Sequence, residues 1–242
     1  MESTRASTGT LYLMPIWLGE HGGTEQVTPM SIAVAERVTH WFCENERSAR
    51  RALRRMSPSI VMDSLMLHRL DERTTRAEAD SMLAVLRDGN DAAIISEAGM
   101  PGIADPGALL VQAAHRAGIN VVPLIGASSV VLALAASGLN GQRFCFHGYL
   151  PVKPHERKAA IKRLEHEAQH GGAQILIETP YRNDALLADL LVACAPATML
   201  CIAIDLTQPG GSVVTRSVAQ WKSTRTALGK RPAIFILGAA VR

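Results

Sequence analysis

The sequence has few aromatic residues, few cysteines and no long apolar run, and each absence excludes a class of protein. Aromatic residues make up only 4% of the chain, which argues against an RNA-binding platform built from exposed aromatic rings. No stretch approaches the roughly 18 consecutive apolar residues of a membrane-spanning helix. The four cysteines are widely spaced without a Cys-x-x-Cys pair, so we expect buried, reduced thiols at Cys43, Cys145, Cys194 and Cys201.

The N-terminus and the histidines also lack recognisable signals. Residues 1–9 contain no apolar segment of the secretory type, which predicts a cytoplasmic protein that does not bind membranes. The eight histidines are scattered without ligand spacing, so no metal site is expected. A net charge of +3 is compatible with an anionic partner but does not identify one.

Short apolar runs alternate with amphipathic segments, a pattern typical of an α/β protein. The clearest unit begins with an apolar strand at 92–95 and continues through a Gly/Pro-rich loop into a helix that Gly118 ends. Asp105 is the expected N-cap of this helix and Pro106 its first residue. Since a further strand follows at 119–125, we predict a parallel crossover with the 96–102 loop beyond the carboxyl end of its first strand. Ligands bind there in such sheets, although an ordinary turn explains the glycines equally well.

The chain is long enough for two domains, and we place their junction near residues 124–126. The expected domains are 1–124 and 125–242, each with a mostly parallel sheet and with a ligand cleft between them. Further strands are expected at 10–16, 40–43, 144–150, 174–177, 200–205 and 233–237. Further helices are expected at 29–38, 48–56, 76–87, 130–137, 158–169 and 184–193, with a polar loop at 68–73 and an edge segment at 213–221.

Basic side chains are concentrated in one predicted helix. The segment 47–55 carries Arg47, Arg50, Arg51, Arg54 and Arg55 with few acidic residues nearby. Such a helix could contact RNA phosphates, contact a partner subunit, or present a solvated face.

Three motifs together resemble the tetrapyrrole methylase superfamily. They are Ser-Glu-Ala-Gly-Met-Pro-Gly-Ile-Ala-Asp-Pro-Gly at 96–107, the segment from Ser-Gly-Leu at 137 to Gly-Tyr-Leu-Pro at 148–151, and Glu-Thr-Pro-Tyr-Arg at 178–182. The nearest branch is the S-adenosylmethionine-dependent ribose 2'-O-methyltransferases of small-subunit ribosomal RNA. The likeness extends from about residue 11 to residue 237.

This resemblance implies a homodimer and a methyl donor, S-adenosylmethionine, held largely by main-chain groups. The residues that it assigns to the donor are Ala98, Gly99, Met100, Ile103, Ser128, Ser129, Glu178, Thr179, Leu206 and Thr207. Glycine at position 99 would let the backbone approach the ligand. Glu44 and Arg47 match the ends of a Glu-Asp-Thr-Arg motif in the relatives and are the catalytic candidates, although a helix-capping ion pair explains them equally well.

We therefore predict a methyltransferase acting on RNA, with three alternatives. A tetrapyrrole or other small molecule could be the acceptor, or the chain could bind the donor without catalysis, because Trp17, Glu20, Asn45 and Glu46 depart from the relatives' motifs. A dinucleotide oxidoreductase is disfavoured because no Gly-x-Gly-x-x-Gly follows the first strand.

Overall fold

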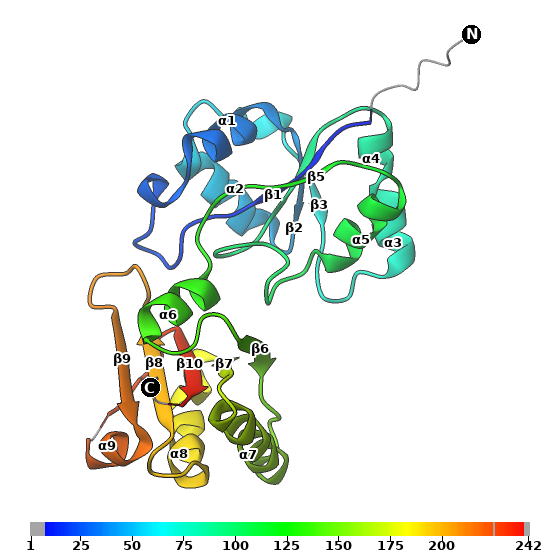
Figure 1. The fold of residues 1–242 in the computed structure, drawn as a ribbon. Coiled ribbons are helices and arrows are strands. Elements are labelled where there is room, and N and C mark those ends of the chain that lie inside the picture. The colour runs from blue at the N-terminus through cyan, green and yellow to red at the C-terminus, as the bar shows by residue number, and fades with distance from the viewer. Residues whose placement is uncertain (1–7, 225, 240–242) are drawn as a thin grey trace. The chain divides into compact units, whose positions relative to one another are not determined.

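The computed structural model describes residues 8–224 and 226–239. These residues form two compact units that divide between Ala127 and Ser128 (Figure 1). Each unit is a sheet with helices on both faces, so the predicted pair of α/β domains is present.

Unit 1 is built on a five-stranded sheet in which every strand pair is parallel. The strand order is β3-β2-β4-β1-β5. The central strand β4 is buried at all four positions, because helices cover both faces of the sheet and the strand is accordingly apolar throughout. The bounds are β1 Leu11–Met14, β2 His40–Cys43, β3 Met66–Arg69, β4 Ala92–Ile95 and β5 Val121–Pro123.

The helices of unit 1 enclose two cores, one on each face of this sheet. One core contains the fully buried Trp41 and residues of α1 and α2, whereas the other contains the fully buried Phe42 and residues of α3, α4 and α5. The bounds are α1 Pro29–Arg37, α2 Glu46–Met56, α3 Arg76–Met82, α4 Ala84–Arg87 and α5 Ala108–Arg116, with short 3-10 turns at Thr24–Gln26 and Met62–Ser64.

Three local expectations for unit 1 were wrong. Helix α2 begins at Glu46, because the Asn45 side chain accepts hydrogen bonds from the amides of Arg47 and Ser48 and so acts as the N-cap. Strand β3 lies partly in the segment expected to be a polar loop, since its edge position tolerates polar residues. Helix α5 begins only at Ala108, because Gly107 has a φ of 139°, which cannot continue a helix from Pro106.

Unit 2 corrects the expectation of a second mostly parallel sheet. Its five strands have the order β6-β7-β10-β8-β9, and only the β6–β7 pair is parallel. The short 205–211 connection between β8 and β9 cannot contain the crossover that parallel strands require, so this pair is antiparallel. Strand β10 also pairs antiparallel with both of its neighbours, β7 and β8. The bounds are β6 Phe144–Tyr149, β7 Ala173–Ile177, β8 Met199–Ile204, β9 Ser212–Ser217 and β10 Ala233–Gly238.

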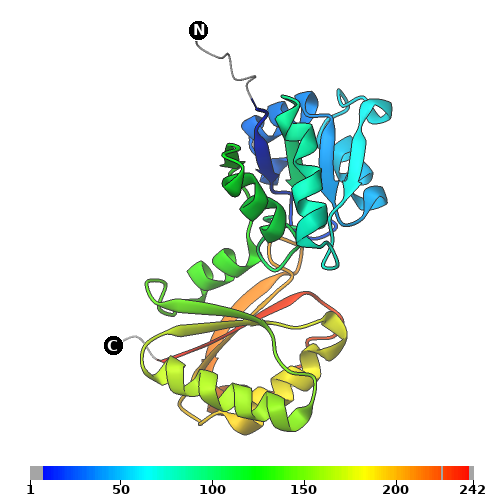
Figure 2. The same cartoon turned by 90° about the vertical axis from the view of Figure 1, so that its right-hand side faces the viewer.

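Helices also cover both faces of the second sheet (Figure 2). Helix α6 packs on one face, and α7, α8 and α9 pack on the other around Leu176 and Phe235. The bounds are α6 Ser129–Ser137, α7 Pro154–Gln169, α8 Asn183–Ala193 and α9 Val218–Ser223, with a 3-10 turn at Pro180–Arg182. Within the described part of the chain, no helix has the length and apolar character needed to cross a membrane.

Candidate functional site

The motif loop at 96–107 follows β4 at the carboxyl edge of the parallel sheet of unit 1. It is anchored to the segment after β1, because the Ile16 amide donates a hydrogen bond of 3.0 Å to the Gly99 carbonyl. The Ser96 hydroxyl donates to the same carbonyl over 3.2 Å. The loop is therefore held by its own backbone at the edge of the sheet where α/β proteins bind ligands.

The glycine at position 99 is explained by the fold itself. Its φ is 71°, and an added Cβ atom would lie 3.2 Å from Leu18 Cδ2 and 3.4 Å from the Ala127 carbonyl oxygen. Both the left-handed backbone and the close packing therefore favour glycine here, before any ligand is considered. Ala98, in contrast, is exposed and has an ordinary φ, so its side chain is directed away from the packed core.

In unit 2, the Glu-Thr-Pro-Tyr-Arg motif follows β7. The Glu178 carboxylate is buried, and its Oε1 atom accepts hydrogen bonds from the Thr179 amide over 2.6 Å and from the Arg182 guanidinium over 2.6 and 3.0 Å. Glu178 is thus occupied in fixing the turn, which leaves the backbone and the Thr179 side chain as the groups available to a ligand.

The loop after β8 carries backbone strain. Asp205 and Thr207 have φ values of 47° and 66°, and Ala104 in the 96–107 loop has a φ of 62°. Among the described residues, these three are the non-glycine residues with positive φ, and all lie in loops that the family resemblance assigns to the donor. Strain of this kind persists only where the surrounding structure imposes it, and it is enriched at ligand sites.

Ser128 and Ser129 lie at the start of α6. Ser128 occupies the N-cap position but makes no side-chain capping bond. Gly126, just before them, is required because an added Cβ atom would come within 2.3 Å of Pro15 Cγ.

The catalytic candidates Glu44 and Arg47 lie at the end of β2 and in the first turn of α2, and both are exposed. No ion pair joins them within the part of the chain that the structure describes. Capping of α2 is instead performed by Asn45, one of the residues that departs from the relatives' motif. The alternative that Glu44 and Arg47 exist to cap this helix is therefore wrong.

The structure adds one residue, Asp105, to this group. Asp105 and Glu44 line the same small hollow at the carboxyl ends of β2 and β4, together with Ser96. Burial raises the pKa of Asp105 to about 6, and the negative charges of Glu44 and Glu97 add to this effect. Sequence reasoning missed Asp105 because it was interpreted as a helix cap.

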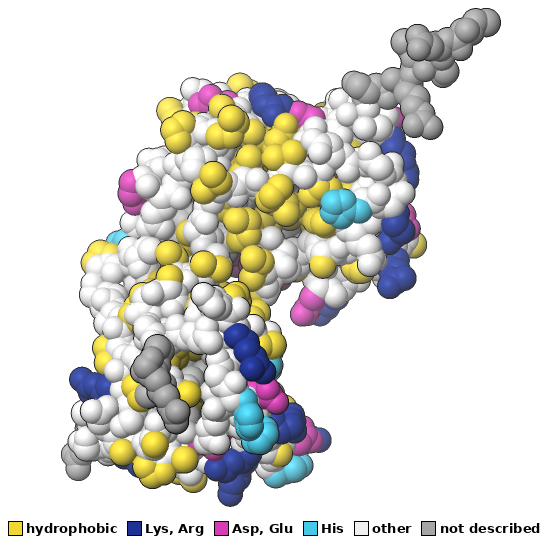
Figure 3. All heavy atoms as spheres, in the orientation of Figure 1, with side chains coloured by type: hydrophobic (Ala, Val, Ile, Leu, Met, Phe, Trp, Pro, Cys, Tyr) yellow, Lys and Arg dark blue, Asp and Glu magenta, His cyan; other side chains and the backbone are white. Residues whose placement is uncertain are grey.

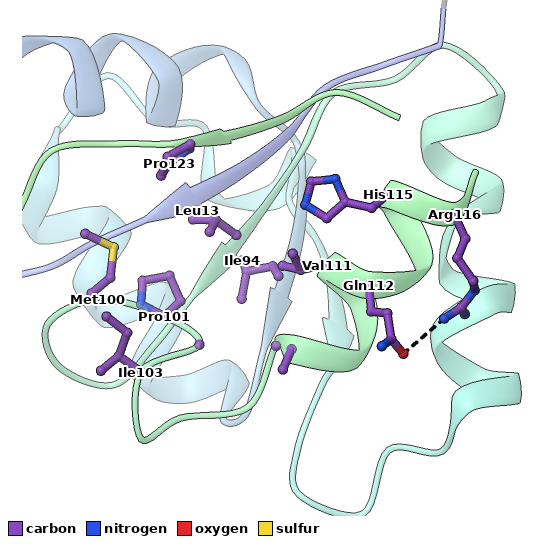
Figure 4. Close-up of a pocket in the computed structure, with 13 residues that line it drawn as sticks. Leu13, Ile94, Met100, Pro101, Ile103, Val111, Gln112, His115, Arg116 and Pro123 are labelled. Carbon is purple, nitrogen blue, oxygen red and sulfur yellow. Dashed lines mark hydrogen bonds between the residues drawn. The ribbon is translucent and has the colours of Figure 1, made fainter. Parts of the chain in front are cut away.

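A larger hollow of about 690 Å³ lies beside the motif loop, between α5 and strands β1 and β5 (Figure 4). Its walls are mostly apolar, with Gln112, His115 and Arg116 at one end. Apolar side chains gather over this part of unit 1 in the space-filling view (Figure 3). The apolar wall residues include Leu13, Ile94, Met100, Pro101, Ile103, Val111 and Pro123.

The arginines of α2 divide into two groups. Arg50 donates to the Met62 carbonyl, and Arg55 donates to the Glu20 carbonyl while stacking 4.9 Å over the ring of the buried Trp17. These contacts give Trp17 a structural role, although it departs from the relatives' motif. Arg47, Arg51 and Arg54 are exposed and form no ion pair with any described residue. No described group of three or more histidine, cysteine or acidic side chains could hold a metal ion.

Comparison with known proteins defines the class of this chain. The family model for tetrapyrrole (corrin/porphyrin) methylases matches residues 21–220. The chain therefore belongs to this family, whose members are S-adenosylmethionine-dependent methyltransferases. Its fold is similar to that of the methyltransferase CobJ, with a TM-score of 0.63 and 22% identity, covering 97% of this chain and 95% of that one. Uroporphyrin-III-C-methyltransferase from Thermus thermophilus gives a TM-score of 0.52 at 20% identity, covering 95% and 94%.

The relatives identified by sequence share one protein name. The chain is 33% identical over 214 residues to ribosomal RNA small subunit methyltransferase I of Xylella fastidiosa, covering 88% of this chain and 74% of that protein. It is 31% identical over 207 residues to the protein of the same name in Escherichia coli O157:H7, covering 86% and 68%. The predicted resemblance and the predicted pair of α/β domains are therefore confirmed, with the second sheet mostly antiparallel instead of parallel.

If Ala98 lines the donor site, the variant Ala98→Leu will weaken binding of S-adenosylmethionine about tenfold or more, equivalent to about 1.4 kcal/mol, because the added side chain occupies the ligand's space. Isothermal titration calorimetry measures this affinity. The matched control is Ala117→Leu, which enlarges another exposed alanine of unit 1. Equal affinities in two folded variants would remove Ala98 from the donor site.

Proposed function

We propose that this chain transfers a methyl group from S-adenosylmethionine to a ribose 2'-oxygen of small-subunit ribosomal RNA. The observation that carries this proposal is the similarity to ribosomal RNA small subunit methyltransferases over more than 85% of the chain. Two features of the structure support it. The loops after β4 and β8 contain residues with positive φ, and the exposed arginines Arg47, Arg51 and Arg54 of α2 form no ion pair with any described residue. Ribosomal RNA as substrate would place the protein in the cytoplasm.

The residues proposed to bind the donor lie in loops of each unit. Unit 1 contributes Ala98, Gly99, Met100 and Ile103, and unit 2 contributes Ser128, Ser129, Glu178, Thr179, Leu206 and Thr207. The strained and glycine-containing backbone of these loops suits a ligand that is held mainly by main-chain groups. When bound, S-adenosylmethionine supplies an electrophilic methyl group, so the chain needs only to align the acceptor, exclude water and accept one proton.

We assign the role of the base, which accepts the proton of the acceptor hydroxyl, to Asp105 with the support of Glu44. A base is most effective when its pKa lies near the working pH, and Asp105 meets this condition at about 6. Glu44 contributes by its negative charge, which helps to hold the pKa of Asp105 above its ordinary value. Arg47, exposed at the start of α2, is placed to contact an RNA phosphate.

With Asp105 as the base, the methylation rate should depend on pH in a defined way. The base must be ionised, so the methylation rate of the wild-type protein will rise through a pH of about 6. Asp105→Asn will lower the rate about a hundredfold and remove that rise. Glu44→Gln removes one charge that raises the pKa of Asp105, and the rise will therefore move to lower pH. An unchanged pH profile in Asp105→Asn would exclude Asp105 as the base.

The proposed reaction is tested by incubating the full chain with methyl-labelled S-adenosylmethionine and small ribosomal subunits. Methylation at a ribose 2'-oxygen removes the hydroxyl that drives alkaline cleavage, so the label will be recovered in alkali-resistant dinucleotides.

Replacing Arg51 and Arg54 together with Glu will weaken RNA binding about tenfold and flatten its salt dependence, without changing donor affinity. The control places the same charge change on α7, at the exposed Lys158 and Arg163. Transfer to a tetrapyrrole, but to no RNA, would refute the proposed acceptor.

We also propose that the chain forms a homodimer through the apolar hollow of unit 1. The mostly apolar walls of this hollow form an exposed patch of the kind that a second protein surface buries. Val111→Glu places a charge in the hollow and will convert the dimer to a monomer in sedimentation velocity at micromolar concentration. Val192→Glu, on the exposed face of α8, will have no effect. A monomeric wild-type protein would end this proposal.

A further inference from the structure

The four cysteines differ in their surroundings, and Cys145 stands apart. Burial raises the pKa of Cys43 to about 11 and that of Cys194 to about 12, and it also raises the pKa of Cys201. These three thiols are therefore protected both by burial and by protonation. Cys145 is exposed on β6, a strand at one edge of the sheet of unit 2. The expectation that all four thiols are buried is wrong at this position.

Strand register places two polar side chains beside this thiol. Cys145 pairs with Gln174 of β7, and His147 follows two residues later on the same strand, so all three side chains lie on one face of the sheet. The Cys145 sulfur lies 4.0 Å from His147 Nδ1 and 4.0 Å from the Phe146 carbonyl oxygen. His147 Nε2 lies 2.7 Å from Gln174 Oε1.

The hydrogen bonds determine which imidazole nitrogen faces the sulfur. Gln174 is 4% exposed, and its amide nitrogen donates to the Gly172 carbonyl oxygen over 2.9 Å. A carbonyl oxygen can only accept, so the nitrogen of the Gln174 amide must be the atom on that side. Its Oε1 atom must therefore face His147, and His147 Nε2 must carry the hydrogen that it donates there. In the neutral ring, Nδ1 then has no hydrogen and presents its lone pair to Cys145. A thiol, a base and a buried group that orients the base form the arrangement of an activated nucleophile.

We propose that Cys145 is a thiol activated by His147 and a site of reversible modification by low-molecular-weight disulfides such as glutathione disulfide. In this step the Cys145 proton moves to His147 Nδ1, and the thiolate attacks one sulfur of the disulfide. A new sulfur–sulfur bond joins Cys145 to one half of the reagent while the original bond breaks. The other half leaves as a thiolate and takes the proton from His147. The protein thiol is oxidised and one equivalent of small thiol is released, so no further oxidant is needed.

The proposal is tested on the folded full-length chain with dithiobis-nitrobenzoate, an aromatic disulfide that releases a coloured thiolate. The wild-type protein will show one fast thiol at pH 7, and Cys145→Ser will lack it. An isolated thiol is only a few per cent ionised at this pH. His147→Gln will therefore slow the fast phase about tenfold or more. The control His155→Gln replaces another exposed histidine and will leave the rate unchanged. With glutathione disulfide, mass spectrometry of peptides will locate the adduct on Cys145.

A second variant separates activation from folding. Gln174→Met keeps a side chain of similar length but removes the group that orients His147, and it will slow the same phase while the three buried thiols stay unreactive. A wild-type rate in both His147→Gln and Gln174→Met would overturn the proposal, as would a fast phase that persists in Cys145→Ser. This test is independent of the methyltransferase assignment, because it needs neither donor nor RNA.

Discussion

Parallel register in unit 1 is the constraint on which the candidate site depends. Met14, Cys43 and Ile95, the last residues of β1, β2 and β4, are aligned with one another, so these three strands end at the same edge of the sheet. The residues that follow are brought together without regard to their distance in sequence. Glu44 thereby reaches the hollow that Ser96 and Asp105 also line. Burial at that hollow, together with the negative charges of Glu44 and Glu97, raises the pKa of Asp105 to about 6.

Glycines at the edge of the sheet allow backbone segments to pack closely against one another. Gly126 allows the chain leaving β5 to pass against Pro15, and Gly99 allows the motif loop to bond to the segment after β1. In unit 2 the same purpose is served at Gly211, where an added Cβ atom would come within 2.1 Å of the Asp205 carbonyl oxygen and so prevent the β8–β9 turn from closing. Backbone packing within each unit therefore helps to fix the conformation of these loops.

Much of this arrangement could be predicted from the sequence, because it follows local rules. Apolar runs gave β2 and β4 their observed bounds, and Gly118 ends α5 in the left-handed conformation expected of it. Local rules failed where tertiary packing decides the conformation. Asp105 has the chemistry of an N-cap, but the φ of 139° at Gly107 delays the helix and leaves Asp105 beside Glu44. The direction of the strands in unit 2 likewise depends on pairing across the sheet, which periodicity does not encode.

The difference between local sequence and tertiary packing also explains why the cysteine thiols of this molecule differ in exposure. Cys201 and Cys145 both lie on strands of unit 2, but β8 is interior and β6 is at an edge. Cys201 lies in the core beneath α6, where burial raises the pKa of its thiol, whereas Cys145 is exposed beside a histidine. The orientation of that histidine then depends on Gln174, whose partner Gly172 is fixed by the turn that starts β7. Reactivity here is a property of strand order and register, and it becomes visible only after the sheet has been assembled.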